Sequence, residues 1–495
     1  MTYQELWDRV LALADAYQRM GINPGERVMC ALPTCAEHVM AMHAAWVCGA
    51  VHVGVHRELT ALELSALMRR LEPRALLYQP TAGDEGHPAL GIGTAGPLPR
   101  MVRLLHGEAS QGDDVPLDSL LAPDASVDFR PRLPGLVDPA VVFLTSGSTG
   151  RTKAVVDTLP GLWGKVALFS RMLRPGPDDV HLMYLPICHA FGLKLTNLAL
   201  LTGGRLVLLD RFTPGAALDL VTTEGVTVLP ATPTHLSILL ANLDGALHRT
   251  ASVRWIPSAA AGLPRPLVEQ VYQRLEAEIL FVYGCSEGFL CVTTDRHDIL
   301  AGSVGSTVFR GPSGTPPDGR ISVVDPDRHT PLAPGEPGEI VFGVSQPVRY
   351  WDEAPAGTGG WYHSGDLGRL DAQGRLFVLG RRKELVNRGG LKVSSGEVES
   401  VLIRHPAVAD GAVVPSPDPV LGEAICACVV PAGAQSPTLS DLRTFLARSL
   451  ARHKLPDELC LLERIPRSSI GKLDRAALQS LVVEADAPRE RLRPR

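Results

Sequence analysis

The chain has 495 residues, of which 45% are hydrophobic and 20% are charged, and its formal net charge is -5. The composition is ordinary for a globular protein, and the length exceeds what one hydrophobic core usually supports, so we expect at least two domains. The negative charge excludes the basic surface that nucleic acid or an anionic membrane would require, and the lack of a signal peptide or membrane-spanning pattern predicts a cytoplasmic protein.

The N-terminal stretch alternates helical and strand-like patterns. Thr2, Thr34 and Thr60 each stand three residues before a glutamate, as in the capping box that opens a helix. A short apolar run, RVMCAL, AVHVGV or RALLYQ, follows each predicted helix. This rhythm predicts an α/β fold with layered helices and largely parallel sheets.

Residues 144–156, LTSGSTGRTKAVV, are the densest run of Gly, Ser, Thr and Lys in the chain. The spacing does not fit a Walker-type P-loop, and the flanking runs AVVFL and KAVV are both strand-like. Gly147 and Gly150 allow the positive φ angles of a backbone nest that binds anions, and Lys153 adds a mobile charge. The hydroxyl groups that would donate hydrogen bonds belong to Thr145, Ser146, Ser148 and Thr149. On the loop alone, a solvated hairpin turn is an equally good interpretation.

From about residue 310 the pattern changes, because short strand-like runs are separated by turns rich in Pro and Gly. This pattern favours a β-rich subdomain. A small α+β unit follows, in which Ser394 caps a helix and the strands GAVVP and AICACVV precede an amphipathic helix. We place the domain boundary near Gly380, with a large N-terminal domain over residues 1–380 and a small C-terminal domain over residues 381–495.

The nine cysteines are scattered, and Cys426 and Cys428 form the closest pair. Strand alternation places both thiols on one face, and no second cysteine pair or neighbouring histidine completes a zinc set. We therefore interpret the cysteines as small buried hydrophobic residues in a reduced compartment.

Six further segments follow the Gly- and Ser-rich loop. They read LPICHAFGL (185–193), SAAAGLP (258–264), YGCSEG (283–288), WYHSGDLG (361–368), GRRKELVNRGG (380–390) and PRSSIGKLDR (466–475). Together with the loop, they resemble the adenylate-forming acyl-CoA synthetase superfamily, which includes aryl- and fatty-acid–CoA ligases, luciferases and nonribosomal peptide adenylation domains. The resemblance covers nearly the whole chain, although relatives usually carry an extra segment before the TYQEL helix. It implies that a carboxylate attacks the α-phosphate of ATP, releasing pyrophosphate, and that a thiol then attacks the acyl-adenylate.

The resemblance also implies ATP, Mg²⁺ and coenzyme A as cofactors. Glu287 and Thr145 would bind the metal, because a hard cation that bridges phosphates prefers oxygen donors. The implied nucleotide-binding residues are Thr145, Ser146, Gly147, Ser148, Thr149, Gly150, Lys153, Ala260, Ala261, Tyr283, Gly284, Ser286, Asp366 and Arg381. Without the motif, Glu287 would be a solvated surface residue, and Tyr283, which is implied to pack against adenine, would be a half-buried strand aromatic.

Two of these residues are assigned to the ribose. Asp366 would accept hydrogen bonds from both sugar hydroxyls, a geometry that suits an acceptor-only carboxylate, and Arg381 would donate to the same sugar. The alternative for both residues is a surface ion pair of little energetic value. We favour the functional role because both residues sit at the predicted domain junction.

The implied catalytic lysine is Lys472, whose role depends on its motif because a lone lysine is normally solvated. A flexible ammonium can bridge the substrate carboxylate and the α-phosphate and then withdraw with its domain. In relatives the small domain rotates between half-reactions about a hinge, which is Lys383 in this chain. The rotated face would present Arg388, Gly389 and Gly390 to the thiol, where glycines allow close approach.

The acyl pocket is implied around His189, which matches the family's histidine or aromatic gate and whose alternative is a structural hydrogen bond. The other residues assigned to the pocket are Lys194, Ser258, Ala259 and Gly284. Where relatives often read SGGAPLP this chain reads SAAAGLP, and the two added methyl groups predict a tight pocket for a short or flat acid.

Lys194 lies in the apolar segment FGLKLTNL, one turn beyond the gate. It either pairs with a second anionic group on the substrate or snorkels from the helix end into solvent. Ala190 stands where amino-acid-activating relatives have an aspartate for the α-amine, which argues against an α-amino acid substrate.

The sequence therefore predicts an AMP-forming acid–CoA ligase for a small carboxylic acid, with an aromatic acid among the candidates. The first alternative is a stand-alone adenylating enzyme that passes the acyl group to a carrier-protein thiol or another nucleophile. A non-catalytic nucleotide-binding homologue is a third reading, and intact Lys472, Glu287 and Asp366 count against it. We expect no nucleic-acid or membrane partner, and a monomer and a homodimer are both consistent with the sequence.

Overall fold

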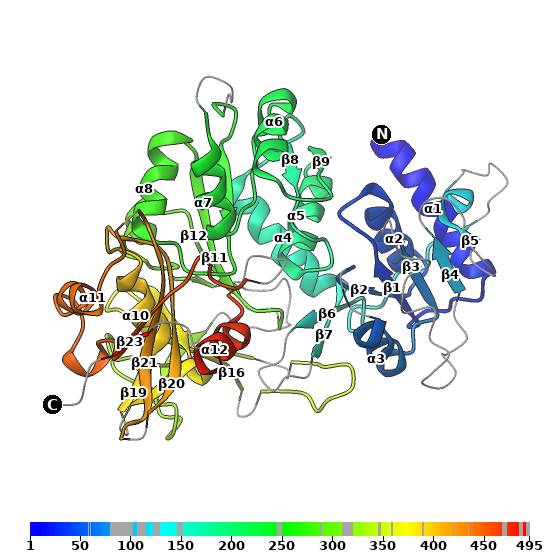
Figure 1. Cartoon of the computed structure of the whole chain (residues 1–495). Helices are drawn as coiled ribbons and strands as arrows, with labels where there is room; N and C mark the ends of the chain where they lie inside the picture. The colour runs from blue at the N-terminus through cyan, green and yellow to red at the C-terminus, as the bar shows by residue number, and fades with distance from the viewer. Residues whose placement is uncertain are drawn as a thin grey trace.

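The computed structural model of the chain places its N-terminal part, in blue, at one end of the molecule and the C-terminal strands, in orange, at the other (Figure 1). The middle part, in green, lies between them. The structure describes residues 1–57, 59, 61–79, 102–105, 115–121, 129–145, 152–244, 250–287, 290–308, 320–344, 348–357, 360–388, 391–418, 420–433, 435–467, 473–484 and 489–491.

The N-terminal sheet has the strand order β5-β4-β3-β1-β2-β6-β7, and its neighbours are parallel except for the antiparallel pair β6–β7. Its strands are β1 (Arg27–Ala31), β2 (Val51–Gly54), β3 (Ala75–Tyr78), β4 (Val102–Leu105), β5 (Val115–Pro116), β6 (Val141–Thr145) and β7 (Lys153–Asp157). The predicted layered α/β fold is confirmed for this part of the chain.

Helices cover both faces of this sheet, because successive strand residues point to opposite sides. Val28 and Cys30 of β1 pack with α1 (Tyr3–Arg19) and α2 (Ala36–Val47). Met29 and Ala31 of the same strand pack with α3 (Ala61–Leu71) on the other face. A short 3-10 helix, η2, spans Leu117–Leu120.

Two of the predicted capping boxes lie within the described residues, and they differ. Thr2 caps α1 through a complete box with Glu5. The box predicted at Thr34 is wrong, because α2 begins after Cys35 and the Thr34 hydroxyl donates instead to the Leu185 carbonyl oxygen at 3.3 Å. The third box involves Thr60, which lies outside the described residues.

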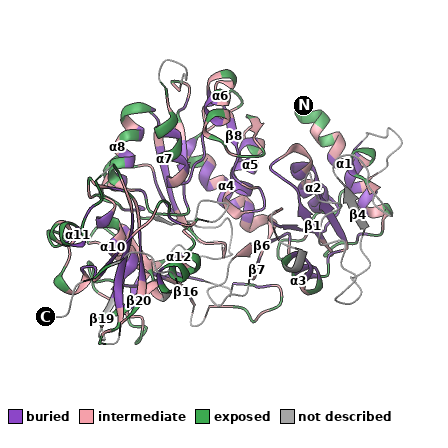
Figure 2. Ribbon diagram, in the orientation of Figure 1, coloured by how far each residue is buried: buried purple, intermediate pink, exposed green. Residues whose placement is uncertain are grey.

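The middle part adds a second α/β layer, in which buried residues gather on the strands and on the inner faces of the helices (Figure 2). The strand order of its larger sheet is β10-β11-β12-β13, and β8 and β9 form a parallel pair joined to β10 through bridges at Val228. The strands are β8 (Val180–Met183), β9 (Arg205–Leu208), β10 (Trp255–Ser258), β11 (Glu278–Gly284), β12 (Leu290–Thr293) and β13 (Thr307–Val308). The helices are α4 (Leu159–Leu173), α5 (Ala190–Leu201), α6 (Pro214–Glu224), α7 (Pro233–Asn242), α8 (Arg265–Arg274) and α9 (Arg296–Ala301).

The predicted β-rich subdomain is an antiparallel sheet in chain order. Its strands are β14 (Ile321–Val324), β15 (Gly338–Gly343), β16 (Trp361–Leu370) and β17 (Leu376–Arg381). The register pairs Asp366 of β16 with Arg381 of β17. Asp366 and Arg381, which belong to two different sequence motifs, are therefore neighbours on adjacent strands.

The C-terminal part has a core of its own, formed by residues such as Val386, Val398 and Leu442. Its long hairpin, β20–β21, contains both strands that the sequence predicts, and Ser394 caps α10 as expected. The elements are η3 (Arg382–Glu384), β18 (Leu385–Arg388), β19 (Leu391–Ser394), α10 (Ser395–Leu402), β20 (Val408–Asp418), β21 (Gly422–Pro431), α11 (Leu439–Leu446), η4 (Arg452–Lys454), β22 (Glu458–Leu461), α12 (Arg475–Glu484) and β23 (Arg489–Arg491).

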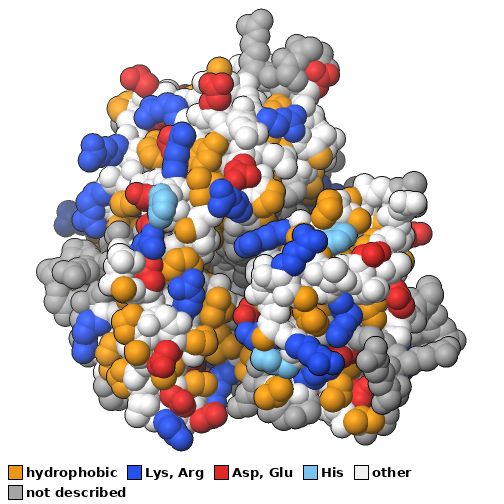
Figure 3. All heavy atoms as spheres, turned by 90° about the vertical axis from the view of Figure 1, so that its left-hand side faces the viewer, with side chains coloured by type: hydrophobic (Ala, Val, Ile, Leu, Met, Phe, Trp, Pro, Cys, Tyr) orange, Lys and Arg blue, Asp and Glu red, His pale blue; other side chains and the backbone are white. Residues whose placement is uncertain are grey.

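Most of the cysteines are buried, as the sequence predicts, whereas Cys35 and Cys285 are half-buried. Cys426, Cys428 and Cys460 are buried together in a small apolar cluster, and none of the described cysteines forms a disulfide. On the surface, Figure 3 shows side chains of both charges scattered among apolar ones on the face it presents. Within the described residues, no helix combines the length and apolarity that crossing a bilayer requires.

Candidate active site

The phosphate loop predicted from the sequence begins and ends on paired strands. Thr145, the last residue of β6, pairs with Lys153, the first residue of β7. The strands on both sides of the loop are thus confirmed, and no helix begins at its end. Residues 146–150 themselves lie outside the described residues, so the structure describes the anchors of this loop alone.

Tyr350 connects the phosphate loop to the predicted metal ligand. The Lys153 ammonium lies 5.1 Å from the centre of the Tyr350 ring, on one side of this residue. The Tyr350 hydroxyl donates to Glu287 Oε1 at 3.3 Å, and Glu287 lies three residues beyond the end of β11. Burial, together with the Glu287 carboxylate, raises the pKa of Tyr350, so its hydroxyl remains a proton donor. The Tyr350 side chain therefore contacts both the cationic candidate Lys153 and the anionic candidate Glu287.

Asp366 forms the most completely satisfied part of the site. Its side chain is buried, at 7% exposure, and Oδ2 accepts a hydrogen bond of 2.7 Å from the Tyr283 hydroxyl. Arg381 Nε lies 3.0 Å from Oδ1. Burial raises the pKa of Asp366, while the Arg381 charge and the Tyr283 hydrogen bond oppose that rise. The surface ion pair that the sequence left as an alternative is wrong for the carboxylate, because it is buried.

Tyr283, which the resemblance implies to pack against adenine, makes two contacts within the protein. In this structure its ring stacks on Phe342 with the ring centres 6.2 Å apart, and its hydroxyl holds Asp366. Gly284, which ends β11, is exposed beside it, and Ser286 is half-buried two residues further on. The Tyr283 hydroxyl therefore orients the Asp366 carboxylate, a role separate from the implied contact with adenine.

The acyl side of the site is built on α5. His189 is the N-cap residue of this helix but does not cap it through its side chain, and its ring stacks on His56 with the ring centres 6.0 Å apart. Lys194, in the second turn, is only 3% exposed. Its predicted alternative, snorkelling into solvent, is therefore wrong. The ammonium lies 5.9 Å from the centre of the Phe143 ring.

The alanines that follow β10 occupy different environments. Ser258 and Ala259 are buried, and the Ser258 hydroxyl has no hydrogen-bond partner among the described residues. Ala260 and Ala261 are exposed. Ala260 has a φ angle of +79°, in the left-handed region that costs a residue with a Cβ atom about 1–2 kcal/mol. Ala260, which stands where relatives often have glycine, therefore adopts a strained backbone conformation.

The predicted hinge follows β17 immediately. Lys383 lies in η3, and its neighbour Arg382 forms ion pairs with Asp327 at 3.1 Å and with Glu339 at 3.5 Å. Arg388, assigned to the thiol side, is held by two contacts of 2.7 Å to Asp457 of its own domain. Gly389, Gly390 and the catalytic candidate Lys472 lie outside the described residues.

Sequence reasoning missed Tyr350 and a group of possible metal donors near the hinge. His329, Glu339 and His363 place ligand atoms within 4.8 Å of one another. Arg382 already contacts Glu339, and Gly365 N–H donates to the same carboxylate, so this group is a satisfied polar network rather than an open cation site. Tyr350 lies outside the quoted motifs, and only the bridge between Val155 and Tyr350 brings it to the loop.

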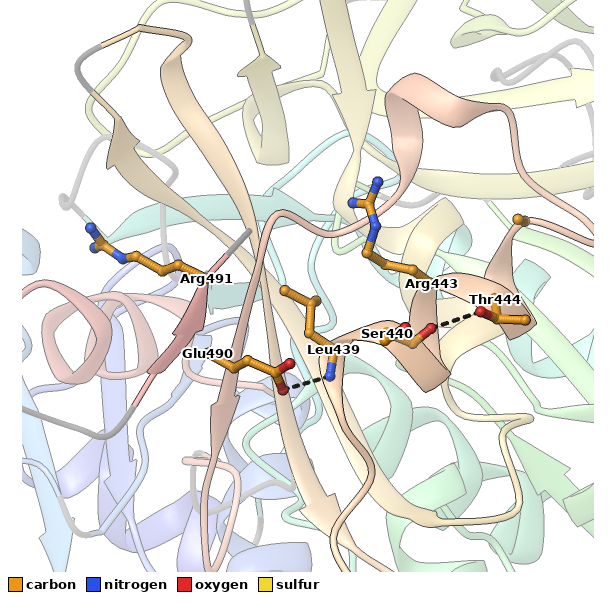
Figure 4. A pocket seen from close by; sticks show the side chains of 7 residues that line it. Leu439, Ser440, Arg443, Thr444, Glu490 and Arg491 are labelled. Carbon is orange, nitrogen blue, oxygen red and sulfur yellow. Dashed lines mark hydrogen bonds between the residues drawn. The ribbon is translucent and has the colours of Figure 1, made fainter. Parts of the chain in front are cut away.

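A surface pocket on the C-terminal domain lies between α11 and β23 (Figure 4). Glu490 accepts a hydrogen bond of 2.7 Å from the Leu439 N–H at the start of α11, which ties the last strand to this helix. The residues that line the pocket include none of the predicted site residues. The hydrogen bond between Leu439 and Glu490 holds two elements of the domain together.

Comparison with known sequences gives matches over both domains. The family model of AMP-binding enzymes matches residues 1–349, and the model of the AMP-binding enzyme C-terminal domain matches residues 397–472. The 2-hydroxy-7-methoxy-5-methyl-1-naphthoate–CoA ligase of Streptomyces carzinostaticus is 32% identical over 97% of this chain and 88% of its own length. The salicylyl-CoA synthase / salicylate adenylyltransferase of a Streptomyces species is 32% identical over 97% of this chain and 89% of its own length.

Solved structures match the whole fold as well. The ATP-bound MatB of Rhodopseudomonas palustris superposes with a TM-score of 0.84 at 25% identity, covering 97% of this chain and 93% of that one. The amide bond synthetase McbA of Marinactinospora thermotolerans gives a TM-score of 0.83 at 26% identity, covering 97% and 94%. The similarity thus extends over both sides of the predicted domain boundary.

Proposed function

The chain belongs to the family of AMP-binding enzymes, and from this premise we propose that it is an AMP-forming acid–CoA ligase for a small aromatic acid. In the first half-reaction the acid carboxylate attacks the α-phosphate of ATP and pyrophosphate leaves. In the second, the thiol of coenzyme A attacks the acyl-adenylate and AMP leaves. The names of the two related Streptomyces enzymes, which describe aromatic acids bearing a hydroxyl group, support an aromatic substrate.

The observation that carries this proposal is the buried Asp366 carboxylate, which the half-buried Tyr283 and the exposed Arg381 hold in place. An ionised carboxylate is an acceptor only, which suits two hydroxyl donors, and Arg381 favours this form against the effect of burial. Asp366 is thus prepared to receive two adjacent hydroxyl groups, such as those of a ribose. Because Tyr283 and Arg381 hold the carboxylate before any ligand arrives, little ordering is needed on binding.

The phosphates of ATP would lie beside Lys153 and Glu287. Lys153 supplies a positive charge to the polyphosphate, and the Glu287 carboxylate and Thr145 hydroxyl supply hard oxygen donors of the kind that Mg²⁺ prefers. This donor set fits the metal, which would neutralise charge on the phosphates when bound. Tyr350 orients Glu287 through its hydrogen bond.

The C-terminal domain would complete each half-reaction in turn. Lys472 would bridge the acid and the α-phosphate during adenylation, and rotation about Lys383 would then present Arg388, Gly389 and Gly390 to the thiol. The proposal takes residues 381–495 as this mobile unit. The ion pairs of Arg382 with Asp327 and Glu339 hold the residue just before the hinge on the large domain, so rotation about Lys383 can leave them intact.

A second acceptor is supported by one comparison. The amide bond synthetase McbA, which matches this fold closely, has a name that describes an amide product. An adenylating enzyme that passes its acyl group to a carrier-protein thiol or to an amine is therefore the alternative to the coenzyme A ligase.

Pyrophosphate release with ATP and Mg²⁺ over a panel of small acids, each with and without coenzyme A, tests the proposal. We expect release to depend on a small aromatic acid and to be accelerated by coenzyme A, with an acyl-CoA product. Release that ignores coenzyme A would favour the alternative acceptor. The absence of release with every acid would contradict adenylation itself.

The role of Lys472 can be tested separately. A Lys472→Ala change should lower adenylation by roughly 100-fold or more, because charge-assisted contacts to two reacting groups are lost. Thioester formation from a supplied acyl-adenylate should stay within about threefold of wild type. Equal loss of both half-reactions would show that the role is wrongly assigned.

A further inference from the structure

Lys194 is a buried lysine of helix α5. It is 3% exposed, and within the described residues its ammonium makes no hydrogen bond or ion pair. Its one described contact is with the face of the Phe143 ring, at 5.9 Å from the ring centre. A buried charge that is neither paired nor hydrogen-bonded is costly, so its presence in the core calls for a reason.

The neighbouring Lys165 illustrates the usual arrangement. It is also buried, at 5% exposure, but its ammonium lies 2.6 Å from Asp157 Oδ2 in an ion pair. Asp157 is therefore already engaged, and it further accepts a hydrogen bond from the Thr158 N–H. Lys165 lowers the pKa of Lys194, and burial is the larger cause of its fall to about 7. Lys194 thus has a like charge nearby, and no carboxylate of the described residues forms an ion pair with it.

The position of Lys194 connects it with the acyl side of the site. It stands five residues after the gate candidate His189, on the helix that this residue begins. Phe143, beneath its ammonium, lies in β6 two residues before Thr145, and Cys285, directly after β11, is close enough to raise its pKa. The ammonium therefore lies where β6, β11 and α5 meet. Ser258, at the end of β10, is a further buried polar group whose hydroxyl has no hydrogen-bond partner in the described part of the chain.

We propose that Lys194 determines acid specificity by binding a second acidic oxygen on the substrate, either a ring hydroxyl or a second carboxylate. The inference rests on the proposed function, since it concerns the acid that this site activates. The substrate group supplies the acceptor that no described residue provides. The ammonium keeps its contact with the face of the Phe143 ring. An unsubstituted acid such as benzoate leaves the ammonium unpaired.

The test compares wild type with Lys194→Met, which keeps the length of the side chain and removes the charge. Pyrophosphate release is measured with benzoate, with the ortho, meta and para hydroxybenzoates, and with the three benzenedicarboxylates. We expect wild type to prefer one substituted acid over benzoate by roughly 10-fold or more in kcat/KM, the effect of a hydrogen bond to a charged group. In Lys194→Met this preference should fall to within about threefold. The hydroxyl and carboxylate series decide which acidic oxygen is recognised.

A pH profile separates recognition from a structural role. The ammonium is present below a pKa of about 7, so the wild-type preference should decline as the pH rises through that value. The charged groups that act on it are Lys165, Asp157 and Cys285, and all three remain in Lys194→Met. The preference of this variant should therefore be flat across the same range. Lys194→Gln provides a second variant with the same expectation if the methionine variant folds poorly.

The outcomes distinguish the inference from the proposed function. Pyrophosphate release with an acid selectivity that is equal in wild type and both variants overturns the role of Lys194 and leaves the ligase intact. A wild-type enzyme that prefers benzoate to every substituted acid also overturns it. Wild-type protein that releases pyrophosphate with no acid overturns the proposed function, and the inference falls with it.

Discussion

The nucleotide side and the acyl side of the candidate site differ in whether the described residues supply a partner for the buried charged side chain. On the nucleotide side, Asp366 has a cation and a hydroxyl donor at hydrogen-bond distance in the protein alone. On the acyl side, Lys194 has no such partner among the described residues. A group common to every turnover can be preorganised by the protein, whereas an unpaired charge makes binding depend on what the substrate brings. The nucleotide side thus favours tight binding of ATP, which is the same in every turnover. The acyl side favours selection among different acids.

The largest expected effect comes from removing the charge on the nucleotide side. Asp366→Asn should lower kcat/KM for ATP by roughly 100-fold, because an ionised acceptor for two hydroxyl groups is lost and Arg381 is left without its anion. Steady-state kinetics with ATP as the varied substrate measure this effect. Asp327→Asn is the matched control, since it removes an exposed carboxylate that pairs with Arg382 and should change kcat/KM less than about threefold. Equal effects from both changes would remove the distinction between the two carboxylates.

The next effect compares the two buried lysines by stability. Lys165→Met should lower the free energy of unfolding by about 3 kcal/mol, because it leaves the largely covered Asp157 carboxylate without its cation. Lys194→Met should leave stability unchanged or raise it, because it replaces an unpaired buried charge by an apolar side chain of similar length. Denaturant unfolding of both variants, monitored by circular dichroism, checks this difference. A similar loss in both variants would mean that Lys194 is a structural cation.

The smallest effect concerns the strained loop between the two sides. Ala260→Gly should raise the free energy of unfolding by about 1 kcal/mol, since glycine adopts the φ angle of +79° without a Cβ penalty. Ala261→Gly is the control, because Ala261 is equally exposed but is not among the residues with positive φ. That change should be neutral or mildly destabilising through the flexibility of the unfolded chain. Thermal unfolding of the pair measures the difference, and stabilisation by Ala261→Gly alone would contradict it.

Local patterns in the sequence predicted much of the fold. The α-then-β rhythm, the strands around the phosphate loop, the β-rich subdomain and the hairpin with Cys426 and Cys428 all appear in the structure. Each depends on alternation, periodicity or turn residues within a short segment. The failed capping box at Thr34 shows the limit, because its hydroxyl binds Leu185, 151 residues away, in place of its own helix.

The sequence by itself determined the family and the set of candidate residues, since motif order and residue chemistry are properties of the chain alone. Tertiary structure decided which of those residues meet and what partners they have. Only the register of β16 and β17 gives Asp366 its arginine, and only the bridge from Val155 brings Tyr350 between Lys153 and Glu287. Lys194 could be read as exposed or buried from its helix, because a periodic pattern does not say what covers each face. The packing of α5 against its neighbours buried it, and the lack of a paired anion among the described residues is the basis of its proposed role.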